Sequence, residues 1–212
     1  MEIIINFKNY IYGKKSLDLT NKIKKYLPNA IVVVSPIDVR SIEYYSKIQV
    51  FSQNVDLVKD NKSTGFINPS LLKYAKAKGT LLNHSEHKIP VKEIKEILKN
   101  CKKINLKVVV CAVNLREAKE IKKFKPYAIA FEDPKLISTG KSITKYNSEN
   151  LKKFIDLLKG TKIIPICGAG ISSIEDVREA KKLGCKGVLI SSAIANSKNP
   201  DKFLKELGHI RW

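Results

Sequence analysis

This sequence of 212 residues lacks the marks of membrane, secreted and zinc-binding proteins. No apolar run approaches the roughly 20 residues that a transmembrane helix needs, so we expect no membrane span. The first residues carry no basic region ahead of their apolar stretch, and no cleavage site of small residues follows, so we expect a cytoplasmic protein without a secretory signal. The four cysteines form no C-x-x-C pair, which argues against zinc fingers and thioredoxin-like sites and predicts buried, reduced thiols.

Acidic residues are scarce: 20 Asp and Glu stand against 40 Lys and Arg, for a formal net charge of +20. Such a charge attracts nucleic acid, anionic membranes or small anions. Arginine is also rare, because only Arg40, Arg116, Arg178 and Arg211 are present, whereas dedicated nucleic-acid surfaces tend to cluster arginine with aromatic residues. We therefore expect a lysine-rich surface that binds nucleic acid only nonspecifically at low salt. A basic nucleic-acid-binding protein is the alternative outside the enzymes.

Much of the hydrophobic content, which is 43% of the chain, lies in short β-branched runs. Six runs are apolar throughout, as parallel strands covered on both faces are, and 49–51 and 80–82, which begin with Gln49 and Thr80, are two further strand candidates. The eight candidates are residues 3–5, 31–34, 49–51, 80–82, 108–110, 128–130, 163–166 and 188–190. Lys- and Glu-rich segments with helical spacing lie between them, as in 91–98 and 151–158. Repeated strand–helix units predict a trimmed (β/α)8 barrel in one domain over residues 1–212, with an open doubly wound sheet as the alternative.

Two segments have the form of a capping box at the start of a helix. They are Asn114-x-x-Glu117 and Ser172-x-x-Glu175. In such a box the first side chain accepts a hydrogen bond from the backbone three residues later, and the acidic side chain reaches back. We therefore expect helices to begin just after Asn114 and Ser172.

In a barrel of this kind, functional residues follow the C-terminal ends of the strands. The residues at those positions include Asn6, Lys8, Asn83, His84, Ser85, Glu86, Glu132, Gly168, Gly170, Ser191 and Ser192. A carboxylate, an imidazole and an ammonium group would therefore meet at one mouth. The small-residue turns beside them open helices, whose first N–H groups can hold an anion.

Glu132 and His84 are the titratable candidates. Glu132 directly follows an apolar strand, where a carboxylate is costly unless it is solvated, paired or functional. The loop over residues 133–141 has an apolar tip and Gly140, which predicts a lid. His84 can exchange protons near neutral pH. A simple helix cap and a metal site with His87 are the alternatives for His84, although no third metal ligand is evident.

In chain order these motifs resemble the triosephosphate isomerase family, and the short form resembles its archaeal type. The matching segments are residues 6–8, 83–86, 132 with 137–140, 167–171 and 187–190. The likeness runs along essentially the whole chain. The resemblance implies a cofactor-free and metal-free aldose–ketose isomerase that interconverts dihydroxyacetone phosphate and glyceraldehyde 3-phosphate through an enediol(ate), in glycolysis and gluconeogenesis.

The resemblance also implies a role for each matched residue. Glu132 is the base that moves a proton between C1 and C2, and His84 is the neutral electrophile at the carbonyl. Lys8 supplies positive charge to the phosphate and the developing oxyanion, with Glu86 as a supporting carboxylate. The residues implied to bind substrate are Asn6, Phe7, Lys8, Ile137, Ser138, Gly170, Ser191 and Ser192.

The family's members are dimers, or tetramers in the archaeal form, so the resemblance implies a homo-oligomer. The residues give a separate reason, because the long loop over 60–66 carries Phe66 at its tip, and an exposed aromatic is better buried against a neighbouring subunit. The rival enzymes are other phosphate-binding barrels, such as sugar-phosphate epimerases. His84 and Glu132 at the ends of the fourth and sixth strands argue against them.

Overall fold

The computed structural model describes residues 1–58, 60, 62–137, 139 and 142–210. Eight parallel strands form a closed barrel in chain order, because β8 pairs with β1. The strands are β1 Glu2–Asn6, β2 Ile31–Val34, β3 Gln49–Ser52, β4 Gly79–Leu82, β5 Lys107–Ala112, β6 Ala128–Phe131, β7 Ile164–Cys167 and β8 Gly187–Ile190. The predicted (β/α)8 barrel is confirmed, and the open sheet is excluded.

The strands are buried on both faces, which explains why their sequences do not alternate with polar residues. Along β1, Ile4 packs inside the barrel with Phe51 and Leu81, whereas Ile3 and Ile5 pack outward against the helices. Phe51 fills the interior because its neighbour is glycine: a Cβ atom on Gly79 would lie 2.5 Å from the Phe51 ring. The barrel is therefore a packed core, and only its ends are open to ligands.

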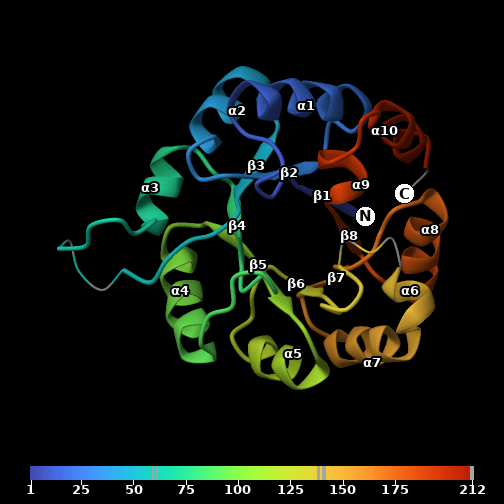
Figure 1. The fold of residues 1–212 in the computed structure, drawn as a ribbon. Helices are drawn as coiled ribbons and strands as arrows, with labels where there is room; N and C mark the ends of the chain where they lie inside the picture. Colours follow the sequence, from blue (N-terminus) through green and yellow to red (C-terminus); the bar gives the residue numbers. More distant parts are fainter. Residues whose placement is uncertain (59, 61, 138, 140–141, 211–212) are drawn as a thin grey trace.

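Helices surround the barrel (Figure 1). They are α1 Gly13–Tyr26, α2 Val39–Ser46, α3 Pro69–Tyr74, α4 Val91–Lys103, α5 Leu115–Lys122, α6 Ile143–Tyr146, α7 Ser148–Leu158, α8 Ile174–Leu183, α9 Ser192–Ala195 and α10 Asp201–Gly208. The apolar residues predicted to face the core do so, as in α7, where the whole stripe from Leu151 to Leu158 is buried. None of the helices in the described residues has the length and apolar character needed to cross a membrane. All four cysteines are buried, as expected.

The helix caps differ in detail from the prediction. Asn114 caps α5 as expected, since its side chain accepts from the backbone of Glu117 at 2.8 Å. The box predicted at Ser172 and Glu175 is wrong by one residue: Ser173 and Asp176 form it. Asp176 is buried and also accepts hydrogen bonds from the backbone N–H and the hydroxyl of Ser172. The buried Asp176, rather than the exposed Glu175, therefore supplies the carboxylate of the cap.

Candidate active site

A pocket lies at the C-terminal ends of the strands, between the connections that follow them. Its lining is Asn6, Lys8, His84, Ile137, Gly168, Ala169, Gly170, Ile171, Ser172, Leu189, Ser191 and Ser192. Eight residues singled out in the sequence are among them, drawn from the ends of β1, β4 and β8 and from the loops after β6 and β7. The pocket thus brings together groups that lie far apart in the chain.

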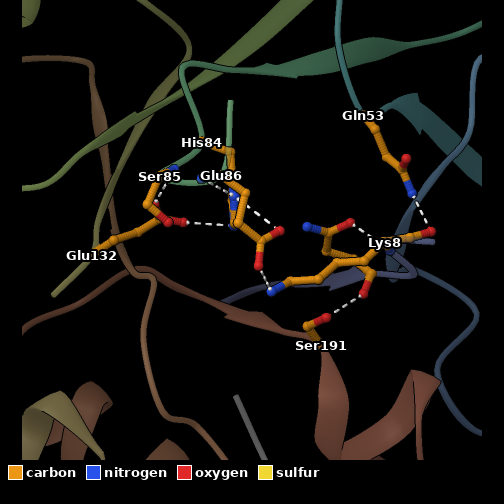
Figure 2. Close-up of polar contacts among 8 residues, drawn as sticks. Lys8, Gln53, His84, Ser85, Glu86, Glu132 and Ser191 are labelled. Atoms are coloured by element: carbon orange, nitrogen blue, oxygen red, sulfur yellow. Dashed lines mark hydrogen bonds and ion pairs between the residues drawn. The ribbon is translucent and has the colours of Figure 1, made fainter. Parts of the chain in front are cut away.

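Lys8 has a backbone that few residues other than glycine adopt, with φ at 47°. Two hydrogen bonds hold it: its N–H donates to Asn6 Oδ1 at 3.0 Å, and Gln53 Nε2 donates to its carbonyl at 2.7 Å. The ammonium group pairs with Glu86 Oε1 at 2.6 Å (Figure 2). This strained turn fixes one cation at the pocket wall. Gln53 was not among the predicted site residues.

The hydrogen bonds of His84 define the role of each ring nitrogen. The backbone N–H of Glu86 donates to His84 Nδ1 at 3.2 Å, so Nδ1 acts as an acceptor and the ring proton belongs on Nε2. His84 Nε2 lies 3.2 Å from Glu132 Oε1 (Figure 2). The side chain is 12% exposed and lines the pocket. It can therefore donate a hydrogen bond from Nε2 to a bound molecule.

Glu132 is completely buried and stands beside the pocket rather than in its lining. Its Oε2 accepts from the backbone N–H of Ser85 at 3.1 Å (Figure 2). Burial raises the pKa of Glu132, and the nearby His84 and the Ser85 N–H only partly offset this effect. A Cβ atom on Gly168 would lie 2.9 Å from Glu132 Cγ, so glycine there leaves the carboxylate room to turn toward the pocket.

The other predicted substrate contacts divide into three groups. Ile137, Gly170, Ser191 and Ser192 line the pocket, and Ser191 Oγ also donates to the carbonyl of Asn6 at 2.8 Å. The side chain of Phe7 is instead fully buried in the core that packs the helices on the barrel, and it is absent from the pocket lining. Ser138 lies outside the described residues, as do the lid residues 140 and 141.

The first turn of the predicted lid is tied down by Asp133. The Asp133 carboxylate accepts from the backbone of Lys135 at 3.0 Å and from Asn147 Nδ2 at 3.0 Å. Leu136 is buried, whereas Ile137 reaches the pocket. The described part of this connection therefore leads from the Glu132 strand to the pocket wall.

Behind His84 lies a polar network that the sequence did not indicate. Asn83 is buried with φ at 60°, and its Nδ2 donates to the carbonyl of Cys111 at 2.8 Å and to Glu117 Oε1 at 2.9 Å. Glu117 also pairs with Lys88 and accepts from the N–H of Val113. The sequence marked Glu117 only as part of a capping box. That pattern predicts that Glu117 accepts a hydrogen bond from the backbone at the start of its own helix, whereas in the structure it also accepts one from Asn83.

This network predicts a pH-dependent contribution to stability from Glu117. Burial raises the pKa of Glu117, but hydrogen bonds from Lys88, Val113 and Asn83 outweigh it and hold the pKa below the usual range. A depressed pKa stabilises the fold above the normal carboxyl range, and this gain is lost as the pH falls through the folded-state pKa. Glu117→Gln is therefore expected to lower Tm at pH 7, with a smaller difference from the parent protein at pH 3.

The matched control is Glu120→Gln, on the same helix, because the Glu120–Lys123 pair is exposed and contributes little. Thermal unfolding of the three proteins at both pH values checks the prediction. An unchanged Tm for Glu117→Gln at pH 7 would show that the network does not stabilise the fold.

Within the described residues, no group of three or more His, Cys, Asp or Glu side chains is arranged to hold a metal ion. The metal-free site stays a prediction. The pocket presents an imidazole with a donor at Nε2 and an ammonium group, and the buried carboxyl group of Glu132 lies beside it, against the imidazole. Together these groups can remove a proton next to a carbonyl, polarise that carbonyl and hold an anion.

Known proteins are similar in sequence to this chain over nearly its whole length. The family model described as triosephosphate isomerase matches residues 1–207. The chain belongs to the triosephosphate isomerase family. Among its relatives, the triosephosphate isomerase of Sulfolobus acidocaldarius is 37% identical over 211 residues, covering 96% of this chain and 92% of that protein. The triosephosphate isomerase of Methanocaldococcus jannaschii is 33% identical, covering 98% of each.

The fold agrees with this membership in the triosephosphate isomerase family. The crystal structure of triosephosphate isomerase from Bartonella henselae superimposes with a TM-score of 0.74, covering 96% of this chain and 95% of that one. Its sequence is 17% identical, so this likeness bears on the fold alone. The similarity of this chain to the archaeal form of the family rests on the sequence identity with the archaeal relatives.

Proposed function

We propose that this chain is a cofactor-free isomerase that interconverts glyceraldehyde 3-phosphate and dihydroxyacetone phosphate, as in glycolysis and gluconeogenesis. The observation that carries the proposal is the juxtaposition of Glu132, His84 and Lys8 at one pocket, in a chain of the triosephosphate isomerase family. A proton next to a carbonyl is weakly acidic, so its removal needs a placed base and a donor at the oxygen.

In the proposed reaction, Glu132 removes the proton from one carbon and returns it to the next. Its carboxylate now contacts Ser85 and His84, so it must first turn toward the pocket, and Gly168 gives it the space. Its raised pKa makes it a stronger base than an exposed carboxylate. His84 donates a hydrogen bond from Nε2 to the oxygens of the enediol(ate). This hydrogen bond does not require a charge on the imidazole.

The substrate phosphate lies, in this proposal, between Lys8 and the turns at Gly170 and Ser191–Ser192. The Lys8 ammonium group supplies charge, while backbone N–H groups at these turns supply directional donors. Asn6 orients the substrate oxygens. Closure of the lid after Glu132 would exclude water, which protects an enediol phosphate from losing its phosphate group.

The direct test couples the reaction to glycerol-3-phosphate dehydrogenase and follows NADH oxidation with glyceraldehyde 3-phosphate as substrate. We expect rapid turnover that is unchanged after dialysis against a chelator. Absence of turnover would refute the isomerase, and its loss on chelation with recovery on metal addition would refute the metal-free mechanism. A preparation with sugar-phosphate epimerase activity instead would support the rival barrel enzymes.

We further propose that the enzyme is a homodimer or homotetramer. The connection between β3 and α3 reaches away from the barrel (Figure 1), and Phe66 on it is 53% exposed. Each chain carries +20, so an interface must be largely apolar and association should strengthen with salt. These features favour burial of Phe66 against a second copy of the chain.

Phe66→Ser is accordingly expected to shift the protein toward monomer. Sedimentation at micromolar concentration in moderate salt should show an oligomer for the parent protein and a smaller species for the variant. Tyr45→Ser is the control, since Tyr45 is 68% exposed on α2 and has no part in the proposed contact. A monomeric parent protein under these conditions would contradict the proposal.

A further inference from the structure

The excess of positive charge is unevenly divided between the two ends of the barrel. Each αβ connection runs from a helix end to the next strand, at the end of the barrel opposite the pocket. Together these connections hold eight lysines and no acidic residue; they are residues 27–30, 47–48, 75–78, 104–106, 123–127, 159–163 and 184–186. The βα connections, at the pocket end, hold six lysines and six acidic residues. The strongly basic surface is therefore remote from the candidate active site.

Part of this surface is hollowed into a groove. Three hollows lie in a row at the C-terminal ends of α4, α5, α7 and α8. The first and second hollows share Lys125 and Pro126 in their lining, and the second and third share Gly160 and Thr161, so the three adjoin one another. Figure 1 shows these helices following one another around one side of the barrel. We call this feature the basic groove, since eleven lysines and only two acidic residues line it.

The middle hollow has the densest positive charge. Its volume is about 840 Å³, and Lys119, Lys122, Lys123, Lys125 and Lys162 make half of its lining. The two acidic residues of the groove, Asp156 and Glu179, lie in the third hollow and are paired with Lys159 and Lys182. Both acidic residues therefore pair with lysines outside the middle hollow.

Three lysines of the middle hollow form no ion pair within the described residues, although Lys119 is near enough to Glu120 to act on its charge. Lys122 donates to the carbonyl of Leu157, and Lys123 pairs with Glu120. Among the described residues, nothing acidic lies within ion-pair distance of Lys119, Lys125 or Lys162. Gathering unpaired like charges in a hollow is unfavourable in the isolated protein, and an anion seated there would relieve it.

Helix dipoles explain only part of this arrangement. Lysines in the last turn of a helix stabilise its negative end, but the effect fades beyond that turn. Lys162 lies four residues after the end of α7. Lys125 follows α5 with φ at 53°, and Lys47 and Lys76 have the same left-handed conformation after their helices. Glycine would adopt that conformation with less strain, so local backbone preference does not account for lysine there.

We propose that the basic groove binds single-stranded nucleic acid. A groove bordered by lysine side chains suits a chain of phosphates, whereas a flat bilayer would contact its rims and leave the hollow empty. Phe124 lines one end of the groove, is only half-buried and offers aromatic surface to a base, whereas the Lys107 ammonium group lies over the ring of Tyr127. Because the groove and the pocket lie at opposite ends of the barrel, binding of the strand leaves the pocket open. The inference is independent of the proposed isomerase function.

The test compares two variants with the same loss of formal charge. The groove variant is Lys119→Glu, Lys125→Asn and Lys162→Glu, where asparagine tolerates the left-handed backbone at 125. The control variant is Lys14→Glu, Lys15→Asn and Lys92→Glu, exposed positions in the first turns of α1 and α4, at the pocket end. Fluorescence anisotropy measures binding of a labelled oligo-U of about 20 nucleotides over a range of salt concentrations, and Tm and isomerase activity are recorded for each protein.

We expect the groove variant to bind the oligonucleotide at least about tenfold more weakly than the parent protein at 0.1 M salt, with a shallower dependence of log Kd on log salt. The control variant should change by less than about threefold. An equal loss in both variants would overturn the proposal in favour of bulk charge. Parent protein that binds anionic phospholipid vesicles but not the oligonucleotide would also overturn it, in favour of a membrane surface. Isomerase activity unchanged in the groove variant would establish that the variant is folded.

Discussion

Glu132→Gln is expected to lower kcat by about 10² to 10⁴-fold while the substrate still binds, because a positioned base contributes that much to proton transfer. The amide cannot take a proton at neutral pH, yet it has the size of the carboxylate and can still accept from the N–H of Ser85. The coupled assay gives kcat and KM separately. Turnover within about tenfold of the parent protein would remove Glu132 from the role of base.

The same variant should not lose stability. Burial raises the pKa of Glu132, so the folded state binds its proton more tightly than the unfolded state, and ionisation destabilises the fold as the pH rises. Replacing the carboxylate by an amide removes that cost at neutral pH. We therefore expect Glu132→Gln to have a Tm at pH 7 equal to or above that of the parent protein. A large fall in Tm would mean that the loss of activity reports damage to the fold instead.

Lys8→Met is expected to lower kcat/KM by about 10³-fold or more, with a rise in KM. Among the described residues that line the pocket, Lys8 is the single lysine or arginine. Methionine keeps the length of the side chain and removes its charge, so both the phosphate and the developing oxyanion lose a charge-assisted hydrogen bond. Steady-state kinetics over a wide range of substrate concentration checks the result.

Glu86→Gln is the matched control for Lys8. It breaks the ion pair at 2.6 Å but leaves the ammonium group in place, and the Glu86 side chain is 56% exposed. We expect a change of less than about tenfold in kcat/KM. A loss as large as that of Lys8→Met would mean that the pair, rather than the Lys8 charge, is what the reaction needs.

The barrel could be predicted from the sequence because most of its strands are continuous apolar runs, which differ clearly from the charged segments between them. Continuous β-branched runs such as 31–34 and 108–110 have no other stable place than a sheet buried on both faces, and eight strands with helices between close a barrel. Residues directly after these runs had to meet at one end. His84 and Glu132 therefore lie within contact distance in the structure although 48 positions separate them.

Contacts that depend on the direction of a single side chain escaped prediction. Phe7 stands between two pocket residues, yet its ring turns into the core, because neighbours along a backbone point opposite ways. The capping box was predicted one residue too early for a similar reason: Asp176 points inward to the cap, whereas its neighbour Glu175 points to solvent. Asn83 and Glu117 form a network only because the connection after β4 approaches the first turn of α5, which no local pattern records.

The placement of charge also could not be read from composition. A total of +20 suggested a field that attracts the anionic substrate to the mouth. The βα connections at the pocket end hold six lysines and six acidic residues, whereas the αβ connections at the other end hold eight lysines and no acidic residue. Exposed charges farther than about 10 Å are largely screened at 0.1 M salt, so the lysines at that end contribute little to substrate capture.

The central claim, proton transfer by Glu132 through an enediol(ate), is tested most directly by isomerisation in D₂O. Proton NMR follows glyceraldehyde 3-phosphate with the parent protein and with Glu132→Gln. Because a carboxylate that has taken up a proton exchanges it with solvent, the account predicts deuterium at C1 of the dihydroxyacetone phosphate formed by the parent protein, and almost none with the variant. Product that carries no deuterium, or deuterium incorporation undiminished in Glu132→Gln, would contradict the account.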